Sequence, residues 1–241
     1  MSTPPLSMPA DPAVSGSGCV AQPSPARHPG VEAYVAALRG KHAARLPVGL
    51  PHVVIQMQTD LLRLLPPSRR LLHRAHLHTL VEGGWEDALS DGPPPAYVDP
   101  ESPGLQALSA ATCRACGGKC CRHGGTQAYI NHDSLRQFRA LRPHDSPEDF
   151  VATYADRLAA QTYEGSCVQH GSGGCTLPRA LRSETCNRHL CDGLLRIHGL
   201  RVVAGRDFQC LLVRLSDGQI HSAGLLSEQG FELLDQSPGE L

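Results

Sequence analysis

The sequence predicts an α+β fold, with a mainly helical N-terminal part, a small metal-stapled cysteine-rich part and a C-terminal β-hairpin. Three observations lead to this prediction. Apolar residues recur at helical spacing from Val31 onward. Eight of the ten cysteines lie between residues 113 and 191. A β-rich segment near the C-terminus precedes an Asp-Gly pair. Because only 4% of the 241 residues are aromatic, the irregular cysteine-rich part is not expected to form much core without a bound metal.

The N-terminal elements follow from proline placement and helical periodicity. Residues 1–30 contain seven prolines among Ser, Ala and Gly, which predicts a disordered tail that includes Cys19. Residues 31–90 are expected to form a helical region, because apolar residues recur at helical spacing and prolines or glycines end each segment. The expected helices cover residues 31–44, 52–65 and 67–81.

A proline-rich linker is predicted over residues 91–104, ahead of a cysteine-cluster metal-binding domain over residues 105–230. Helices are expected over residues 105–115, over 135–141 after a cap at Asp133 or Ser134, and over 146–158. The segments 208–215 and 220–226 are expected to form a hairpin around an Asp-Gly turn, with Cys210 in the core.

The charge and hydropathy of the chain exclude several classes of partner. Because the chain has 22 Lys and Arg residues and 23 Asp and Glu residues, it has no excess of positive charge, and a nucleic-acid partner is not expected. No apolar run reaches the roughly 20 residues that span a bilayer, and the first thirty residues contain no apolar signal segment. We therefore expect no membrane contact and a cytoplasmic location, where clustered thiols bind metal or perform redox chemistry.

The cysteines form two clusters whose spacing predicts metal ligands. The first reads Cys113-Arg-Ala-Cys116-Gly-Gly-Lys-Cys120-Cys121 and the second Cys167-x7-Cys175-x10-Cys186-x4-Cys191. A short C-x-x-C lets two thiolates converge on one soft or borderline ion, and nearby Arg and Lys residues would lower thiol pKa values. The adjacent pair Cys120 and Cys121 points in different directions, which favours two ions or two sides of one cluster. Spacing alone leaves the pairing open, and His123, His170 or His189 can replace a thiolate or support one.

This pattern resembles that of the YkgJ-type cysteine-cluster family, which is described as zinc- or iron-chelating and often labelled an Fe–S oxidoreductase. The motif Cys-x-x-Cys-x-Gly-x-Cys-Cys is matched by Cys113, Cys116, Gly118, Cys120 and Cys121, and a second motif by Cys167, Cys175, Cys186 and Cys191. The resemblance covers about residues 110–195 and implies metal chelation. Three positions around the second motif depart from the family pattern: Ser183 replaces a proline, Asn187 an arginine, and the usual aromatic before the last cysteine is missing.

Three functions follow from these residues. The first is chelation of zinc or iron by the eight clustered thiolates. The second is an iron–sulfur protein in electron transfer or in a redox or group-transfer enzyme, and the third is a metal-stapled interaction module for a protein or nucleic-acid partner. The expected cofactor is zinc or iron, including an iron–sulfur cluster, since both metals accept four sulfurs. The chain contains no G-x-G-x-x-G, Walker or G-x-S-x-G motif, so no catalytic residue is predicted.

Overall fold

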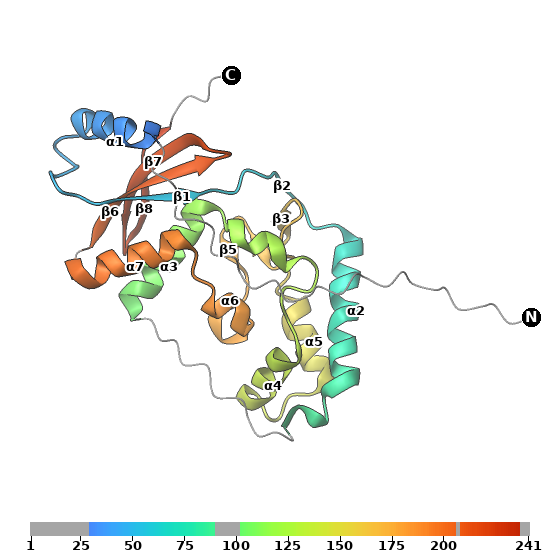
Figure 1. The fold of residues 1–241 in the computed structure, drawn as a ribbon. Coiled ribbons are helices and arrows are strands. Elements are labelled where there is room, and N and C mark those ends of the chain that lie inside the picture. Colours follow the sequence, from blue (N-terminus) through green and yellow to red (C-terminus); the bar gives the residue numbers. More distant parts are fainter. Residues whose placement is uncertain (1–28, 90–101, 206–207, 237–241) are drawn as a thin grey trace, which may run out of the picture.

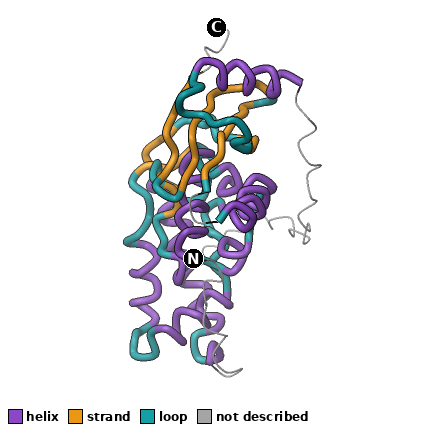
Figure 2. The backbone as a smooth tube through the Cα atoms, turned by 90° about the vertical axis from the view of Figure 1, so that its left-hand side faces the viewer, coloured by secondary structure: helices purple, strands orange, loops and turns teal. Residues whose placement is uncertain are grey.

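A computed structural model describes residues 29–89, 102–205 and 208–236 (Figure 1). The predicted tail and linker lie almost entirely outside these residues, as does Cys19. The described chain forms an α+β structure, as predicted, with a four-stranded sheet in the order β1-β6-β7-β8. Figure 2 shows these strands gathered at one end of the molecule, with most of the helices at the other.

The C-terminal hairpin is confirmed and is part of this larger sheet. Strands β6 (Gln209–Ser216) and β7 (Gln219–Ser227) pair antiparallel, and β7 pairs antiparallel with β8 (Gly230–Gln236). At the turn, Asp217 and Gly218 have φ angles of 49° and 81°. Two consecutive positive φ angles are what a two-residue hairpin turn requires, and an Asp-Gly pair provides them.

The prediction of a helix over residues 52–65 is wrong. The segment contains strand β1 (His52–Gln56), which pairs parallel with β6, and strand β2 (Leu62–Leu64), which pairs antiparallel with β3 (Gln161–Tyr163). A short apolar run rich in β-branched residues fits a buried parallel strand as well as a helix, so its spacing does not distinguish them. Residues 31–90 are therefore not helical throughout, and their packing with the C-terminal sheet crosses the division expected at the linker.

Helices cover both faces of the sheet (Figure 1). On one face, α1 (Pro29–Lys41) packs through Val31, Val35 and Leu38 against Leu211 and Val213. On the other face, α3 (Pro103–Cys116) and α7 (Asp192–Ala204) share a core with β1, β6 and β7. Successive residues of β6 thus enter different cores, as the two-residue period of a strand requires.

The remaining long helices form a second body of packing around three buried aromatic residues, Phe138, Phe150 and Tyr154. These helices are α2 (Pro67–Gly84), α4 (His132–Leu141) and α5 (Pro147–Ala155). Helix α5 begins with the predicted Ser146 cap, which Asp149 completes as a capping box, but it ends three residues earlier than residue 158. Helix α4 is capped by Asn131 and not by Asp133 or Ser134.

Short elements connect these helices and carry four of the nine described cysteines. They are η1 (Asp87–Leu89), η2 (Lys119–Gly124), β4 (His170–Gly171), β5 (Gly174–Cys175), η3 (Arg179–Leu181) and α6 (Glu184–Arg188). Among the described residues, no helix is both long enough and apolar enough to cross a membrane.

Candidate metal centre

The first cysteine cluster lies where helix α3 ends. Cys113 and Cys116 occupy its last turn, and Cys120 and Cys121 lie in η2. Between them, Gly117 and Gly118 both have φ angles of 67°. The Gly117 and Gly118 N–H groups donate to the carbonyls of Arg114 and Cys113, at 3.2 and 3.1 Å. The two glycines therefore end the helix in left-handed conformations that other residues rarely adopt.

The second cluster meets the first through backbone hydrogen bonds. The Cys167 N–H donates to the Cys121 carbonyl at 3.1 Å, and the Val168 N–H to the Gly125 carbonyl at 3.0 Å. Cys175 lies in β5, Cys186 in α6, and Cys191 at the cap position before α7. The fold thus brings two segments some fifty residues apart in sequence to one region.

The sheet and the segment after β1 hold the end of α3 in place. The Arg214 side chain on β6 donates to the Ala115 carbonyl at 3.1 Å and to Ser222 Oγ at 2.7 Å. The Gln58 N–H donates to the Cys116 carbonyl at 2.7 Å. Carbonyls in the last turn of a helix lack partners within it, and these contacts satisfy two of them beside the candidate ligands. Sequence reasoning did not single out Arg214 or Gln58, because nothing in their local pattern marks this role.

Electrostatic coupling links the eight thiols mostly within two groups, although Cys120 also raises the pKa of Cys186 across them. The first thiol group is Cys113, Cys116, Cys120 and Cys191. Burial raises the pKa of Cys113 to about 12, with further contributions from the other three members of this group. The second thiol group is Cys121, Cys167, Cys175 and Cys186. Burial raises the pKa of Cys167 to about 12, and Cys175 and Cys186 raise it further.

The adjacent cysteines Cys120 and Cys121 join the two groups. A hydrogen bond from Cys121 is the main cause that lowers the pKa of Cys120 to about 6, and the charge of His189 lowers it further. The same bond raises the pKa of Cys121, as do burial and the nearby Cys175 and Cys167. Cys120 is exposed and Cys121 is half-buried. The two adjacent thiols therefore differ in exposure and in the direction of their pKa shifts.

Cations near the thiols differ in part from those expected. Arg122, which was expected to lower thiol pKa values, forms an ion pair with Asp60 at 3.5 Å. Cations that do lower thiol pKa values include Arg182, which acts on Cys113 and Cys186, and Arg69, which acts on Cys167. Arg182 thus serves both thiol groups.

The donor chemistry of the site fits a soft or borderline metal, although the present side-chain positions do not surround one. All nine cysteines in the described ranges are free thiols, so no disulfide joins any two of them. In the part of the chain that the structure covers, no three Cys, His, Asp or Glu side chains lie close enough to hold an ion. The fold brings the two predicted clusters to one region without directing their side chains at a common point.

Cys210 stands apart from both groups, as predicted. It is fully buried in the sheet, and burial alone raises its pKa to about 12. The histidines of α2 do not form a site either. His73 is buried with Nδ1 at 2.6 Å from the Thr126 carbonyl, and His76 Nε2 lies 2.7 Å from the Ile130 carbonyl. His73 is therefore a core residue.

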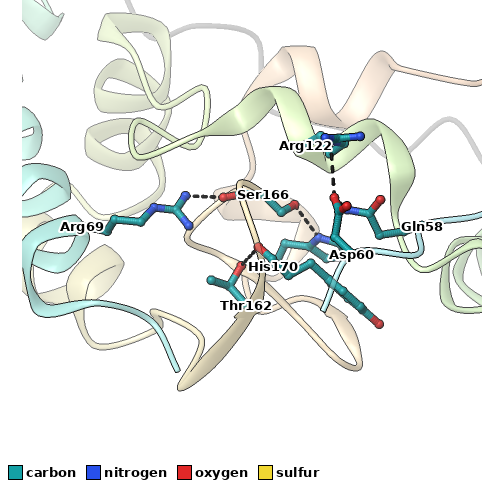
Figure 3. Close-up of polar contacts among 8 residues, drawn as sticks. Gln58, Asp60, Arg69, Arg122, Thr162, Ser166 and His170 are labelled. Carbon is teal, nitrogen blue, oxygen red and sulfur yellow. Dashed lines mark hydrogen bonds and ion pairs between the residues drawn. The ribbon is translucent and has the colours of Figure 1, made fainter. Parts of the chain in front are cut away.

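Of the three histidines near the cysteines, only His170 is buried (Figure 3). Its Nδ1 is hydrogen-bonded to Ser166 Oγ at 2.8 Å, and its ring lies 4.9 Å from that of Tyr163. Burial lowers the pKa of His170, and the Gly117 backbone offsets part of this effect. His123 and His189 are exposed. The sequence placed His170 among three equal candidates, and only the fold distinguishes it.

Searches against protein families, curated proteins and solved structures found no match to this chain. The resemblance to the YkgJ-type family therefore stays a prediction based on the cysteine and glycine positions alone.

Proposed function

We propose that this chain chelates zinc or iron through its eight clustered cysteines. The observation that supports the proposal is that the fold brings the two cysteine clusters into contact, with the Cys167 N–H donating to the Cys121 carbonyl at 3.1 Å. Four thiolates are a complete ligand set for a tetrahedral zinc or for an iron–sulfur site. Cys113, Cys116, Cys120 and Cys191 would hold one metal centre, and Cys121, Cys167, Cys175 and Cys186 the other.

Because the pKa values of the buried thiols are raised, metal binding would require these thiols to lose their protons. At neutral pH, buried thiols such as Cys113 and Cys167 are protonated, because their pKa values are about 12. Thiolate is the form that ligates metal, so binding would release protons and draw the sulfurs of each group together. The positive charge of Arg182 beside both groups would offset part of the resulting negative charge. A bound metal would supply folding free energy to the loops that carry the ligands.

The experiment that tests this proposal is anaerobic purification of the full chain, followed by a visible spectrum and a metal count. A colourless protein with stoichiometric zinc supports chelation of zinc and excludes the iron–sulfur alternative. A brown protein that contains iron and sulfide supports that alternative and excludes zinc. A chain that binds neither metal in stoichiometric amounts, even after anaerobic reconstitution with each, overturns the proposal.

A further inference from the structure

The Gly117-Gly118 turn connects the two thiol groups, because it links Cys116 to the adjacent pair Cys120 and Cys121. Both glycines have left-handed φ angles of 67°. The Gly118 N–H donates to Cys116 Sγ at 3.2 Å, so the turn also contacts a candidate ligand directly. Any shift of this turn would move Cys120 and Cys121 relative to Cys113 and Cys116.

His170 packs directly against this turn. A Cβ added to Gly118 would lie 2.3 Å from His170 Nε2 and 2.7 Å from Cε1. Real Cβ atoms do not approach other atoms so closely, so Gly118 is required both for its backbone conformation and for its lack of a side chain. The imidazole therefore occupies the space that any other residue at position 118 would fill.

The ring of His170 is held from its other side (Figure 3). Ser166 Oγ binds Nδ1 at 2.8 Å, and the Ser166 carbonyl in turn accepts a hydrogen bond from Arg69. The ring of Tyr163 lies against the imidazole at a centroid distance of 4.9 Å. His170 is 1% exposed, which leaves its ring little freedom to move away from the turn.

The position of His170, rather than an unpartnered nitrogen, connects it to the thiol site. Its buried Nε2 faces the Gly117 and Gly118 backbone, and the Gly117 backbone raises its pKa against the effect of burial. His73 also has a buried Nε2 without a hydrogen bond in the described structure and is a core residue, so this feature alone does not mark a site. Groups around a metal site that hold its ligands in place support metal binding.

We infer that His170 is a positioning residue of the thiol site: by packing on Gly118 it fixes the turn that positions Cys120 and Cys121 relative to Cys113 and Cys116. The expected effect of His170 on metal binding rests on the proposed metal chelation. Its effect on the turn itself is testable without metal.

The experiment compares His170→Ala with His73→Ala. His73 is a matched control, since it too is buried, is hydrogen-bonded through Nδ1, and leaves Nε2 without a partner in the described structure. Zinc affinity is measured by competition with a chromophoric chelator, and cobalt(II) spectra report the ligand atoms. We expect His170→Ala to weaken zinc binding by roughly 10–100-fold with unchanged cobalt bands, and His73→Ala to leave the affinity unchanged.

A compensating pair of substitutions tests the contact itself. Gly118→Ala is expected to weaken zinc binding strongly, and Gly118→Ala combined with His170→Ala is expected to recover part of the loss, because the clash with the imidazole is gone. An unchanged affinity in His170→Ala overturns the inference. So does a cobalt spectrum that shows loss of a nitrogen ligand, because His170 would then be a ligand itself.

A metal-free measurement separates this inference from the proposed function. In metal-free wild-type protein, exposed Cys120 is expected to react with iodoacetamide faster than half-buried Cys121, as measured by mass spectrometry. His170→Ala should remove this difference and His73→Ala should keep it. If wild type binds no metal but this pattern holds, the proposed function fails and the role of His170 in the turn stands. If His170→Ala keeps the difference, the inference fails whatever the metal content.

Discussion

The sheet and the thiol region are stabilised by different interactions. Strands β6, β7 and β8 are seven to nine residues long, and helices cover both faces of their sheet with apolar side chains. The thiol region between residues 164 and 191 contains two-residue strands and a five-residue helix. Its buried residues include Ser166, Gln169 and His170. Val168, Leu177 and Leu181 of this region are buried too, in the core with Phe138, Phe150 and Tyr154, so the thiol region combines apolar burial with buried polar contacts to which a metal would add.

Cys210 and Cys113 show the same difference within one residue type. The pKa of each is raised to about 12. For Cys210 the cause is burial alone, but for Cys113 three other thiols add to burial. A buried cysteine is a small hydrophobic residue in the first setting and a candidate ligand in the second. The residues around the cysteine determine which of these two roles it has.

The largest effect on stability is expected from truncation in the sheet. Leu212 is fully buried in β6, so Leu212→Ala should lower the free energy of unfolding by about 2–5 kcal/mol. Urea unfolding checks the stability, and a metal count on the folded fraction checks the site. Because Leu212 shares a core with Ala115 and Cys116, the matched control is Leu211→Ala on the opposite face of β6, whose folded fraction should keep its metal. A Leu211→Ala variant that folds but has lost its metal would show that the two regions do not differ as described.

A smaller effect is expected at the contact between the regions. Arg214→Met removes the hydrogen bonds to Ala115 and Ser222 and should lower the free energy of unfolding by about 1–3 kcal/mol. It should also weaken zinc binding, because the end of α3 carries Cys113 and Cys116. The matched control is Arg201→Met, which breaks the ion pair with Glu228 at 2.6 Å near the start of α3. Equal zinc affinities for the two variants would contradict the role assigned to Arg214.

A pH dependence is expected from Cys210. Its pKa is raised by folding from 9.0 to about 12, so the folded state holds the thiol proton over this range and the unfolded state loses it. The associated stability is complete below pH 9 and decreases as the pH rises toward 12. In Cys210→Val, the free energy of unfolding should therefore decrease less steeply above pH 9, by up to about 1.4 kcal/mol per pH unit. Urea unfolding of metal-free protein at several pH values measures how steeply the free energy of unfolding falls with pH in wild type and in Cys210→Val. Identical slopes for the two proteins would contradict this prediction.

Local patterns predicted those parts of the fold that depend on local interactions. The capping box at Ser146 and the hairpin turn at Asp217 are such cases, because neighbouring residues determine them. The sequence did not predict strand β1, because its conformation depends on pairing with β6. The paired residues His52 and Leu211 are more than 150 residues apart in the sequence. No periodicity within residues 52–65 reports that partner.

The same distinction holds for the candidate site. The spacing of the cysteines predicts eight ligands in two clusters, and the fold brings the two clusters into contact at Cys121 and Cys167. Their division into two groups depends on how residues 167–191 fold back onto η2, which spacing does not encode. The supporting residues Arg214, Gln58 and Ser166 are ordinary polar residues in sequence, and only tertiary contacts relate them to the site.

The most direct test of the account is the metal content of single cysteine variants. The variants are Cys116→Ser in the first thiol group, Cys186→Ser in the second, and Cys210→Ser as the buried control. If two separate groups bind metal, each of the first two variants should lose about half of the metal of wild type, and Cys210→Ser should keep all of it. Wild-type metal content in both Cys116→Ser and Cys186→Ser would contradict the account, as would an equal loss in Cys210→Ser.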